Sequence, residues 1–319
     1  MKNYRALFIC GMSRGGTTWV GHCLNQHPDV AVFGESLYWG RNYIEPGSDG
    51  KYTVEQVRKV LNLLTKDCKA FLGEGEGNLK RLNRDQWKEM LQSIDCVPMT
   101  PKYLFELVCG LIAEREGVEY VVEKTPHHVN WIPRIVRAFP DAKFVVMVRD
   151  PYGFMLSYKH QGDRKLEPAR RDFRALYHPL GCAYIWRKYM KSAIRNSKGF
   201  PDQTMTLKFE ELKQSPVDSW KRLVSFCEMP DFPFTPVADK NSSFQGEERK
   251  LAPIDIFWMN VIGRSQIHSG GYSLRKSGVS FRDILISIWE LCPWFIRALK
   301  LLKSRVPGGL AKYFLRSGK

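Results

Sequence analysis

The feature that most constrains the fold is a short apolar run that leads into a glycine-rich turn. Residues 5–11 read RALFICG, and residues 12–18 read MSRGGTT. An apolar run that ends at a glycine is typical of a buried parallel strand, and the segment after Thr17 has helical character up to His27-Pro28. At such a strand–turn–helix junction, backbone N–H groups converge and the helix dipole adds positive potential. This stretch is therefore predicted to bind a phosphate-like anion.

The turn differs from a nucleoside triphosphate loop at one position. A Walker A loop reads G-x-x-x-x-G-K-[ST]. Gly11, Gly16 and Thr18 match it, while Thr17 stands where the lysine would be. Arg14 adds a permanent fork of donors suited to tetrahedral oxyanions, and the paired glycines let the backbone approach the anion closely. The loop is therefore expected to bind an anion that has no γ-phosphate, for which the missing lysine is not required.

Strands alternate with helical segments along the chain. Strand-like runs at 30–33, 119–126, 143–150 and 205–209 are separated by segments with helical patterning. This order predicts an α/β fold: a P-loop-type doubly wound parallel sheet flanked by helices. Residues 127–139 are expected to form one crossover helix of this fold.

The expected organisation is one overall domain. Its α/β core covers residues 1–236, with a helical insertion at about 40–118. A polar stretch begins after Pro236, and residues 237–319 are expected to form a helical C-terminal extension packed on the core. Thr100-Pro101 and Pro151 are expected to start helices, because proline is favoured at the first helical position.

Charge and cysteine content restrict the function classes. Lys and Arg number 49 against 33 Asp and Glu, so the net charge is +16, and an anionic partner is expected. No helix shows the clustered basic face of a nucleic-acid groove reader, so nucleic acid is not expected as a partner. The eight cysteines form no C-x-x-C pair, which argues against zinc and indicates reduced core residues. With no leader or apolar span of 18 residues, a cytoplasmic protein is expected.

Two segments carry a resemblance to a known family. R-G-G-T-T-W, at 14–19, resembles the 5′-phosphosulfate loop of sulfotransferases that use 3′-phosphoadenosine 5′-phosphosulfate (PAPS). FVVMVRDPYGFMLSYKH, at 144–160, resembles their 3′-phosphate segment, in which a serine follows the arginine by eight positions, as Ser157 follows Arg149. Arg149 is also placed at a strand's carboxyl end, where doubly wound folds bind ligands. The resemblance implies PAPS as cofactor, 3′-phosphoadenosine 5′-phosphate (PAP) as product, and no required metal.

Three further segments are similar to the same family. VVEKTPHH resembles a turn whose lysine, here Lys124, approaches the bridging oxygen of the phosphosulfate. LKFEELKQSP resembles a segment whose aromatic residue, here Phe209, lies near the adenine. SLRKSGVSF is similar to a loop that clasps the 3′-phosphate through Arg275 and Lys276, although a solvated basic loop is equally compatible with it. Trp19 matches an adenine-stacking tryptophan, or anchors its helix in the core.

Sulfuryl transfer is an in-line reaction catalysed mostly by positioning and electrostatic stabilisation. Arg14, Thr17 and Lys124 are candidates for cations and donors on the transferred group, and Lys124 is the better candidate for assisting the leaving group. Glu35, in FGES, is the expected base for the acceptor hydroxyl, and it resembles the glutamate of tyrosylprotein and many bacterial sulfotransferases. The rival base is His127 or His128.

The predicted site can be stated as two sets. The catalytic residues are expected to be Glu35, Lys124, Arg14 and His127. The cofactor-binding residues are expected to be Arg14, Gly15, Gly16, Thr17, Thr18, Trp19, Arg149, Ser157, Phe209, Arg275 and Lys276.

The acceptor and two alternative functions remain open at this stage. The acceptor is expected to be a hydroxyl of a carbohydrate, lipid or small molecule, with residues 40–100 and 160–178 shaping its pocket. Tyr38, Trp39 and Tyr43 could stack on an acceptor ring or belong to the core. The alternatives are a P-loop kinase or NTPase, with Asp150 as its magnesium carboxylate, and a non-catalytic nucleotide-binding module.

The C-terminal segment has an unusual composition. Residues 281–319 contain eight Lys and Arg and two Asp and Glu, so the local charge is 8 − 2 = +6. Aromatic residues and leucines interleave with these basic residues, which suits an interfacial helix on anionic lipid. Peripheral membrane contact is one expectation, and a terminal helix packed on the domain is the other.

Overall fold

The computed structural model describes residues 4–68, 84–163, 167, 169–233 and 249–305. The chain divides into two compact units. Unit 1 comprises Met1–Val148 and Arg195–Ala238, and unit 2 comprises Arg149–Ile194 and Asp239–Lys319. The boundary predicted after Pro236 lies outside the described residues, so the division into 1–236 and 237–319 stays a prediction.

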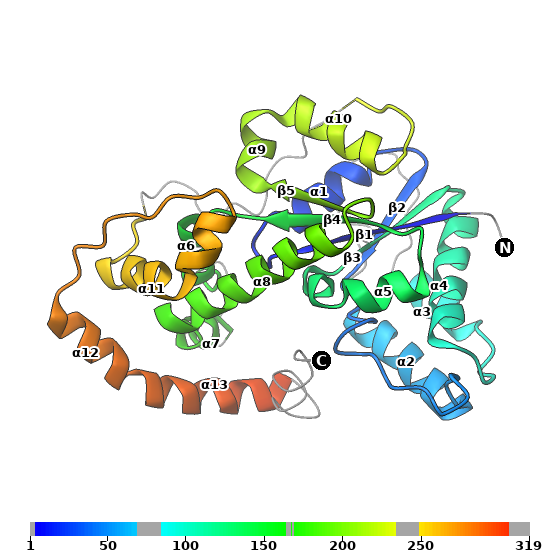
Figure 1. Ribbon diagram of the computed structural model, residues 1–319. Coiled ribbons are helices and arrows are strands. Elements are labelled where there is room, and N and C mark those ends of the chain that lie inside the picture. Colours follow the sequence, from blue (N-terminus) through cyan, green and yellow to red (C-terminus); the bar gives the residue numbers. More distant parts are fainter. Residues whose placement is uncertain (1–3, 69–83, 164–166, 168, 234–248, 306–319) are drawn as a thin grey trace. The chain divides into compact units, whose positions relative to one another are not determined.

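Unit 1 is built on a five-stranded sheet in the order β2-β3-β1-β4-β5 (Figure 1). The strands are β1 (Arg5–Gly11), β2 (Val30–Gly34), β3 (Tyr120–Lys124), β4 (Lys143–Val148) and β5 (Thr204–Lys208). Every neighbouring pair is parallel, so all the carboxyl ends lie at one edge of the sheet. The predicted α/β fold with a parallel sheet is confirmed.

One face of the sheet is covered by α1 (Thr17–Leu24), α9 (Phe209–Gln214) and α10 (Pro216–Phe226) (Figure 1). Side chains alternate between the two faces of a strand, and Leu7 and Ile9 point to this one. They join a buried apolar cluster with residues of the helices, among them Val20, Cys23, Leu24, Leu212, Trp220, Leu223 and Val224. This layer fixes the helix that follows the glycine-rich turn.

The opposite face carries α4 (Pro101–Glu116) and α5 (Ile132–Ala138). Its core is aromatic: the ring of Phe8 stacks on Phe105 of α4 at 5.9 Å and on Phe144 of β4 at 5.1 Å. Stacked rings at such distances stabilise a core beyond the area that they bury. Helices thus cover both faces of the sheet. A ligand site is therefore expected at the carboxyl ends of the strands.

The predicted helical insertion is present as α2 (Val54–Asp67), α3 (Arg84–Gln92) and α4. Thr100 caps α4, since its Oγ1 accepts a hydrogen bond from the Tyr103 N–H at 3.1 Å. Pro101 occupies the first turn, as expected.

The single crossover helix expected over residues 127–139 is wrong. The chain forms a 3₁₀ helix, η1 (Pro126–Asn130), and α5 begins only at Ile132. Pro133 explains the break, because proline lacks the N–H that would bond to the carbonyl four residues earlier and its ring clashes there. Pro133 instead lies in the first turn of α5, where that N–H is not needed.

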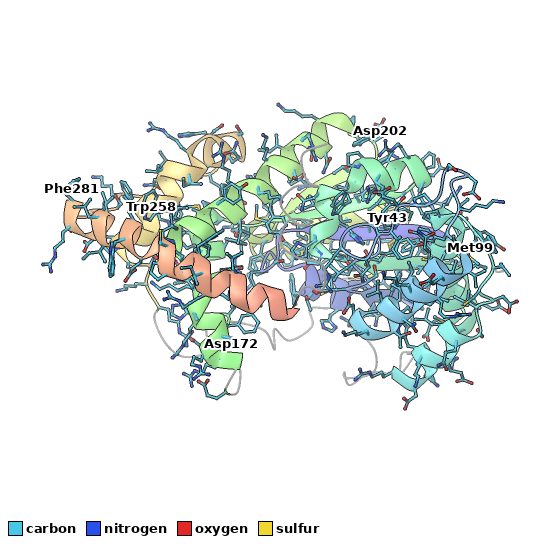
Figure 2. The ribbon with its side chains drawn as sticks, turned by 90° about the horizontal axis from the view of Figure 1, so that it is seen from below. Tyr43, Met99, Asp172, Asp202, Trp258 and Phe281 are labelled. Carbon is cyan, nitrogen blue, oxygen red and sulfur yellow. The ribbon has the colours of Figure 1, made fainter. Side chains whose placement is uncertain are left out.

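Unit 2 is helical in its described part (Figure 2). Its helices are α6 (Pro151–Lys159), α7 (Ala169–Ala175), α11 (Pro253–Ser269), α12 (Phe281–Trp289), α13 (Leu291–Arg305), and most of α8 (Pro179–Gly199), which ends in unit 1. The expected helical C-terminal region is therefore present. No helix in the described ranges has both the length and the apolar character needed to cross a membrane.

Candidate active site

The glycine-rich turn after β1 forms a tight loop at the N-terminus of α1. Gly16 is the N-cap residue in the left-handed region, at φ 90°, and it offers no side-chain cap. Arg14 also has a positive φ, of 66°, which is uncommon for a residue other than glycine. The first four N–H groups of a helix have no partner within the helix. The glycine-rich turn thus leads directly into a helix N-terminus, and its binding of an anion stays a prediction.

Two predicted adenine-side residues lie against this loop. A Cβ atom placed on Gly16 would lie 2.5 Å from the Phe209 ring, so only glycine lets the ring approach this closely. The rings of Trp19 and Phe209 meet edge to face, with centroids 6.4 Å apart. Lys213 places its Nζ 5.3 Å from the centroid of the Phe209 ring. Lys213 was missed from the sequence, although its position four residues after Phe209 on a helix was a signal.

An ion pair lies at the carboxyl edge of the sheet. In the parallel register Gly34 of β2 pairs with Lys124 of β3, so Glu35 follows directly beside that lysine. Lys124 Nζ donates to Glu35 Oε1 at 2.9 Å. The lysine side chain is only 5% exposed, whereas that of Glu35 is 41% exposed. The carboxylate is thus held by the buried ammonium while it still faces solvent.

The ion pair and the anion loop share this edge of the sheet. Lys124 also pairs in register with Ile9 of β1, two residues before the strand gives way to the loop that carries Arg14. Ligands of doubly wound folds bind outside the carboxyl ends of the strands. The structure therefore brings Arg14, Thr17, Glu35 and Lys124 to one edge of unit 1.

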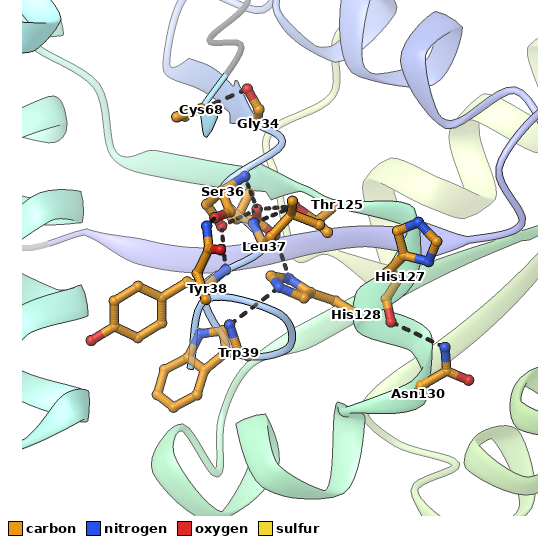
Figure 3. Close-up of polar contacts among 12 residues, drawn as sticks. Gly34, Ser36, Leu37, Tyr38, Trp39, Cys68, Thr125, His127, His128 and Asn130 are labelled. Carbon is orange, nitrogen blue, oxygen red and sulfur yellow. Dashed lines mark hydrogen bonds and ion pairs between the residues drawn. The ribbon is translucent and has the colours of Figure 1, made fainter. Parts of the chain in front are cut away.

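A buried carboxylate lies beneath the ion pair and was missed from the sequence. Glu123 precedes Lys124 on β3 and points to the opposite face of the sheet, where it is 1% exposed. Its Oε1 accepts hydrogen bonds from Ser36 Oγ at 2.6 Å, Ser36 N at 3.3 Å and Thr125 Oγ1 at 2.5 Å. Figure 3 shows Ser36, Thr125 and His128 gathered around this point. Because Ser36 follows Glu35, the network anchors the segment that carries the candidate base.

His128 completes the network on its other side. Its Nδ1 lies 2.7 Å from Glu123 Oε2, and its Nε2 lies 3.3 Å from the backbone N of Trp39. The Trp39 N–H can only donate, so Nε2 is the acceptor and Nδ1 carries the proton. Both ring nitrogens are therefore engaged inside the protein, and this geometry favours Glu35 over His128 as base. The ring of His127 lies apart from the cluster (Figure 3).

The network predicts a pH-dependent contribution of Glu123 to stability. Burial by itself raises the pKa of the Glu123 carboxyl, but the electrostatic interaction with His128 and the hydrogen bonds from His128, Ser36 and Thr125 outweigh it and hold the pKa below its usual value. The contribution is therefore present above the unfolded pKa and is lost as pH falls through the folded one. Glu123→Gln is expected to lower the free energy of unfolding by about 2 kcal/mol at pH 7, since the amide cannot satisfy every donor that the carboxylate accepts.

Urea unfolding at a series of pH values measures this effect. The difference between wild type and Glu123→Gln should shrink as the pH falls from the ordinary carboxyl pKa towards the lower pKa of folded Glu123, because the unfolded chain binds the proton first. Glu119→Gln is the matched control, because Glu119 is exposed just before the same strand. A difference that is independent of pH, or equal in the control, would contradict the role given to the carboxylate.

The second group of predicted residues lies in unit 2, at the start of α6. The carbonyl of Arg149 accepts a hydrogen bond from Trp186 Nε1 at 3.0 Å, which fixes the backbone of the arginine. A Cβ on Gly153 would lie 3.3 Å from Arg149 Nε, so the guanidinium lies against the first turn of the helix. Asp150 caps that turn by accepting from Gly153 N at 2.5 Å. Ser157 is buried further along α6.

Arg275 is held in the same part of unit 2 by contacts that the sequence did not indicate. Its backbone N donates to Tyr152 Oη at 2.8 Å, and its guanidinium lies 4.5 Å from the centroid of the Tyr152 ring. Arg275 Nη2 is also 3.8 Å from Asp150 Oδ2. Lys276 follows in the same loop with an exposed side chain. The structure thus places Arg149 and Arg275 around one helix start, beside Asp150.

The aromatic residues considered for acceptor stacking are mostly core residues. Tyr38 and Trp39 are almost fully buried, and both rings pack on Phe105. Tyr43 is half-buried, and the guanidinium of Arg134 covers its ring at 3.9 Å. Tyr38 and Trp39 are therefore unavailable to an acceptor.

Comparisons with known proteins show the family of the chain. A family model described as "Sulfotransferase family" matches residues 6–233. An uncharacterized protein of Aquifex aeolicus is 24% identical over 235 residues, which is 71% of this chain and 26% of that protein. Protein-tyrosine sulfotransferase 1 of Danio rerio is 21% identical over 229 residues, which is 72% of this chain and 54% of that protein. The chain thus spans only about a quarter and about half of these two relatives.

A solved structure supports the fold. The sulfotransferase domain of the olefin synthase from Synechococcus PCC 7002 superposes with a TM-score of 0.52 at 14% sequence identity. The match covers 86% of this chain and 98% of that domain. At this level of identity the likeness concerns the fold.

Proposed function

The chain belongs to the sulfotransferase family, and we propose that it moves the sulfuryl group of PAPS to an acceptor hydroxyl by in-line displacement. The observation that carries this proposal is that the loop of Arg14 and the Lys124–Glu35 pair share one edge of the sheet. A loop with an arginine and two threonine hydroxyls, a buried ammonium and a partly exposed carboxylate are groups that suit such a displacement.

The residues of unit 1 fit the phosphosulfate end of PAPS. Gly15 and Gly16 pack so closely on Met12 and the Phe209 ring that a Cβ atom would clash, so the tight turn requires glycine. Arg14, Thr17 and Thr18 add donors for a tetrahedral anion. When bound, PAPS supplies the sulfuryl group and a phosphate leaving group. Arg14 and Lys124 would hold the phosphosulfate and supply positive charge to it, and Glu35 would take the proton of the acceptor hydroxyl.

The remaining parts of PAPS are assigned to the other predicted residues. We propose that Trp19 and Phe209 contact the adenine, because their rings meet beside the loop. We also propose that Arg149, Ser157, Arg275 and Lys276 hold the 3′-phosphate, the first and third being gathered at the start of α6. Independence from metal remains a prediction.

The acceptor class is proposed from the name of one relative. The name of the Danio rerio relative says that it acts on protein tyrosine, which favours a phenolic hydroxyl among the acceptors. Hydroxyls of carbohydrates, lipids and small molecules are the other proposed classes. Residues 40–100 and 160–178, which follow the candidate base and α6, are proposed to shape the pocket.

The kinase alternative would use Asp150 as a magnesium carboxylate. In the structure Asp150 caps α6 through Gly153 N and lies beside Arg275. The Asp150 carboxylate is thus a helix cap that lies beside a guanidinium. The positive charge of that guanidinium favours an anion over a cation at this position. The sulfotransferase assignment is therefore preferred.

Transfer of ³⁵S from labelled PAPS tests the proposal. The protein is incubated with a tyrosine peptide, a simple phenol, an oligosaccharide and a hydroxylated lipid, and label on each acceptor is counted after chromatography. Label on any acceptor that disappears in Glu35→Gln is the expected result. Label transferred from γ-³²P-ATP but never from PAPS would overturn the proposal in favour of the kinase.

A further inference from the structure

Helix α12 has an inverted distribution of polar and apolar side chains. Its buried residue is Ser287, whereas Phe281, Leu285, Ile286, Ile288 and Trp289 are exposed. Soluble amphipathic helices show the opposite arrangement, with the apolar stripe facing the core. Phe281 and Trp289 are 75% and 79% exposed, far more than a core-facing aromatic would be.

Polar contacts within unit 2 fix which side of this helix faces inward. Ser287 Oγ accepts a hydrogen bond from Trp258 Nε1 at 2.7 Å, and the Ser287 carbonyl lies 3.1 Å from His178 Nε2. In α13, Trp294 Nε1 donates to the Leu176 carbonyl at 3.0 Å. The helix is therefore tethered by its polar side, and the apolar side is turned away from these tethers.

The outward side forms a continuous apolar face over α12 and the start of α13. Phe281, Leu285, Ile288 and Trp289 follow the spacing i, i+4, i+7, i+8 of one helix face. Phe295 and Ile296 of α13 are also exposed. Of the 14 large apolar residues that are exposed in the described part of the chain, seven lie between positions 281 and 296. A cluster of this kind marks an interaction surface rather than scattered exposure.

The two helices that carry this face are basic by sequence, with five Lys and Arg against two Asp and Glu over residues 281–305. Arg282 and Arg297 are exposed beside the apolar residues, and so is Glu290. Asp283 is engaged at the helix start, where its Oδ2 accepts from Ser280 Oγ at 2.7 Å. By sequence, residues 281–319 contain eight basic and two acidic residues, and the whole chain carries a net charge of +16. The face thus combines aromatic and aliphatic side chains with basic neighbours, which is the composition of an interfacial helix.

We propose that α12 and the start of α13 form a membrane-docking face that lies in the interface of an anionic lipid bilayer. Phe281, Leu285, Ile288 and Trp289 would enter the boundary between headgroups and acyl chains, and Arg282 and Arg297 would lie at the lipid phosphates. Tryptophan is favoured at this depth because it is apolar with one polar edge. The charge argues for anionic lipid rather than a second copy of this chain, since two copies would bring like charges together.

Co-sedimentation with vesicles tests the docking face. The full chain is mixed with vesicles of equal parts phosphatidylcholine and phosphatidylglycerol, and with vesicles of phosphatidylcholine alone. Binding to the anionic vesicles is expected, with much weaker binding to the neutral ones. Phe281→Ser with Trp289→Ser should weaken binding by at least about tenfold, because two large apolar side chains no longer enter the lipid.

Matched variants and a second measurement keep the test decisive. Tyr103→Ser with Val217→Ser removes two exposed apolar residues outside the face and should leave binding unchanged. Arg282→Glu with Arg297→Glu should remove the preference for anionic vesicles without altering the apolar residues. Circular dichroism confirms that each variant is folded. The proposal would be overturned if the wild-type protein stayed in the supernatant, or if the control pair lost as much binding as Phe281→Ser with Trp289→Ser. It would also be overturned if light scattering showed a dimer that the changes at Phe281 and Trp289 convert to monomer.

Discussion

Replacing Glu35 by glutamine is expected to lower kcat for sulfuryl transfer by about 10³-fold, as loss of a general base does. The amide keeps the size of the side chain and an oxygen that can accept from Lys124 Nζ, now 2.9 Å from the carboxylate. It cannot take the proton of the acceptor hydroxyl. Affinity for PAP, measured by titration calorimetry, should therefore stay unchanged while steady-state transfer from labelled PAPS collapses.

The control for this change is Glu45→Gln. Glu45 lies in the same segment after β2, is 56% exposed and pairs with Arg134, away from the ion pair with Lys124. Its loss should leave kcat within the error of the assay. If Glu35→Gln retains near-normal kcat, the base is another residue, and His127→Asn becomes the variant to examine.

Replacing Lys124 by methionine is expected to lower kcat by about 10²-fold to 10³-fold, the usual effect of removing one preorganised electrostatic group. Methionine fills the same buried space without the ammonium that we place near the bridging oxygen. The fold should tolerate the change, because Glu35 is partly exposed and water can solvate its carboxylate. Transfer of ³⁵S under single-turnover conditions separates this chemical effect from product release.

Lys143→Met is the matched control, because Lys143 is the first residue of β4 and so lies at the amino end of its strand, opposite the site at the carboxyl ends. It removes one strand lysine of the same unit and should leave kcat unchanged. The double variant Glu35→Gln, Lys124→Met should lose less than the product of the two single losses, since residues in contact act as a unit. Strict multiplication of the two effects would contradict a shared role at the sheet edge.

Much of unit 1 followed from local sequence signals. Buried parallel strands are short apolar runs, and RALFIC and KFVVMV are distinct enough to be placed within a residue or two. The turn at Arg14–Gly16 was predictable because paired glycines between an apolar strand and a helix are typical of a tight loop at a helix N-terminus. Glu35 and Lys124 were each placed at the end of a strand, and the sheet order then shows that these two strands are neighbours.

The buried network at Glu123 could not be predicted in the same way. Its hydrogen bond to Ser36 joins residues 87 positions apart, and only the register of β2 and β3 brings them together. The signal present in the sequence was a charged residue within an apolar strand, next to a lysine that drew attention first. A buried carboxylate requires hydrogen-bonding partners, and those partners are visible only in three dimensions.

Tertiary packing also determines which aromatic and apolar side chains are buried, and the sequence pattern does not. Tyr38 and Trp39 follow a strand in a loop, where aromatic residues often contact ligands, yet Phe105 from a distant helix buries both. The exposed face of α12 has helical apolar spacing, and that pattern predicts burial just as well as exposure. Only the contacts of Ser287 show that the polar side of α12 faces inward.

The measurement that tests the central claim most directly is calorimetric titration of the purified protein with PAP, with Mg-ATP as the comparison. PAP should bind without added metal, and Arg149→Ala should weaken it by about tenfold or more, the usual effect of losing a charge-assisted hydrogen bond. Mg-ATP should bind far more weakly. Tight binding of Mg-ATP with none of PAP would contradict the assignment as a PAPS-dependent sulfotransferase.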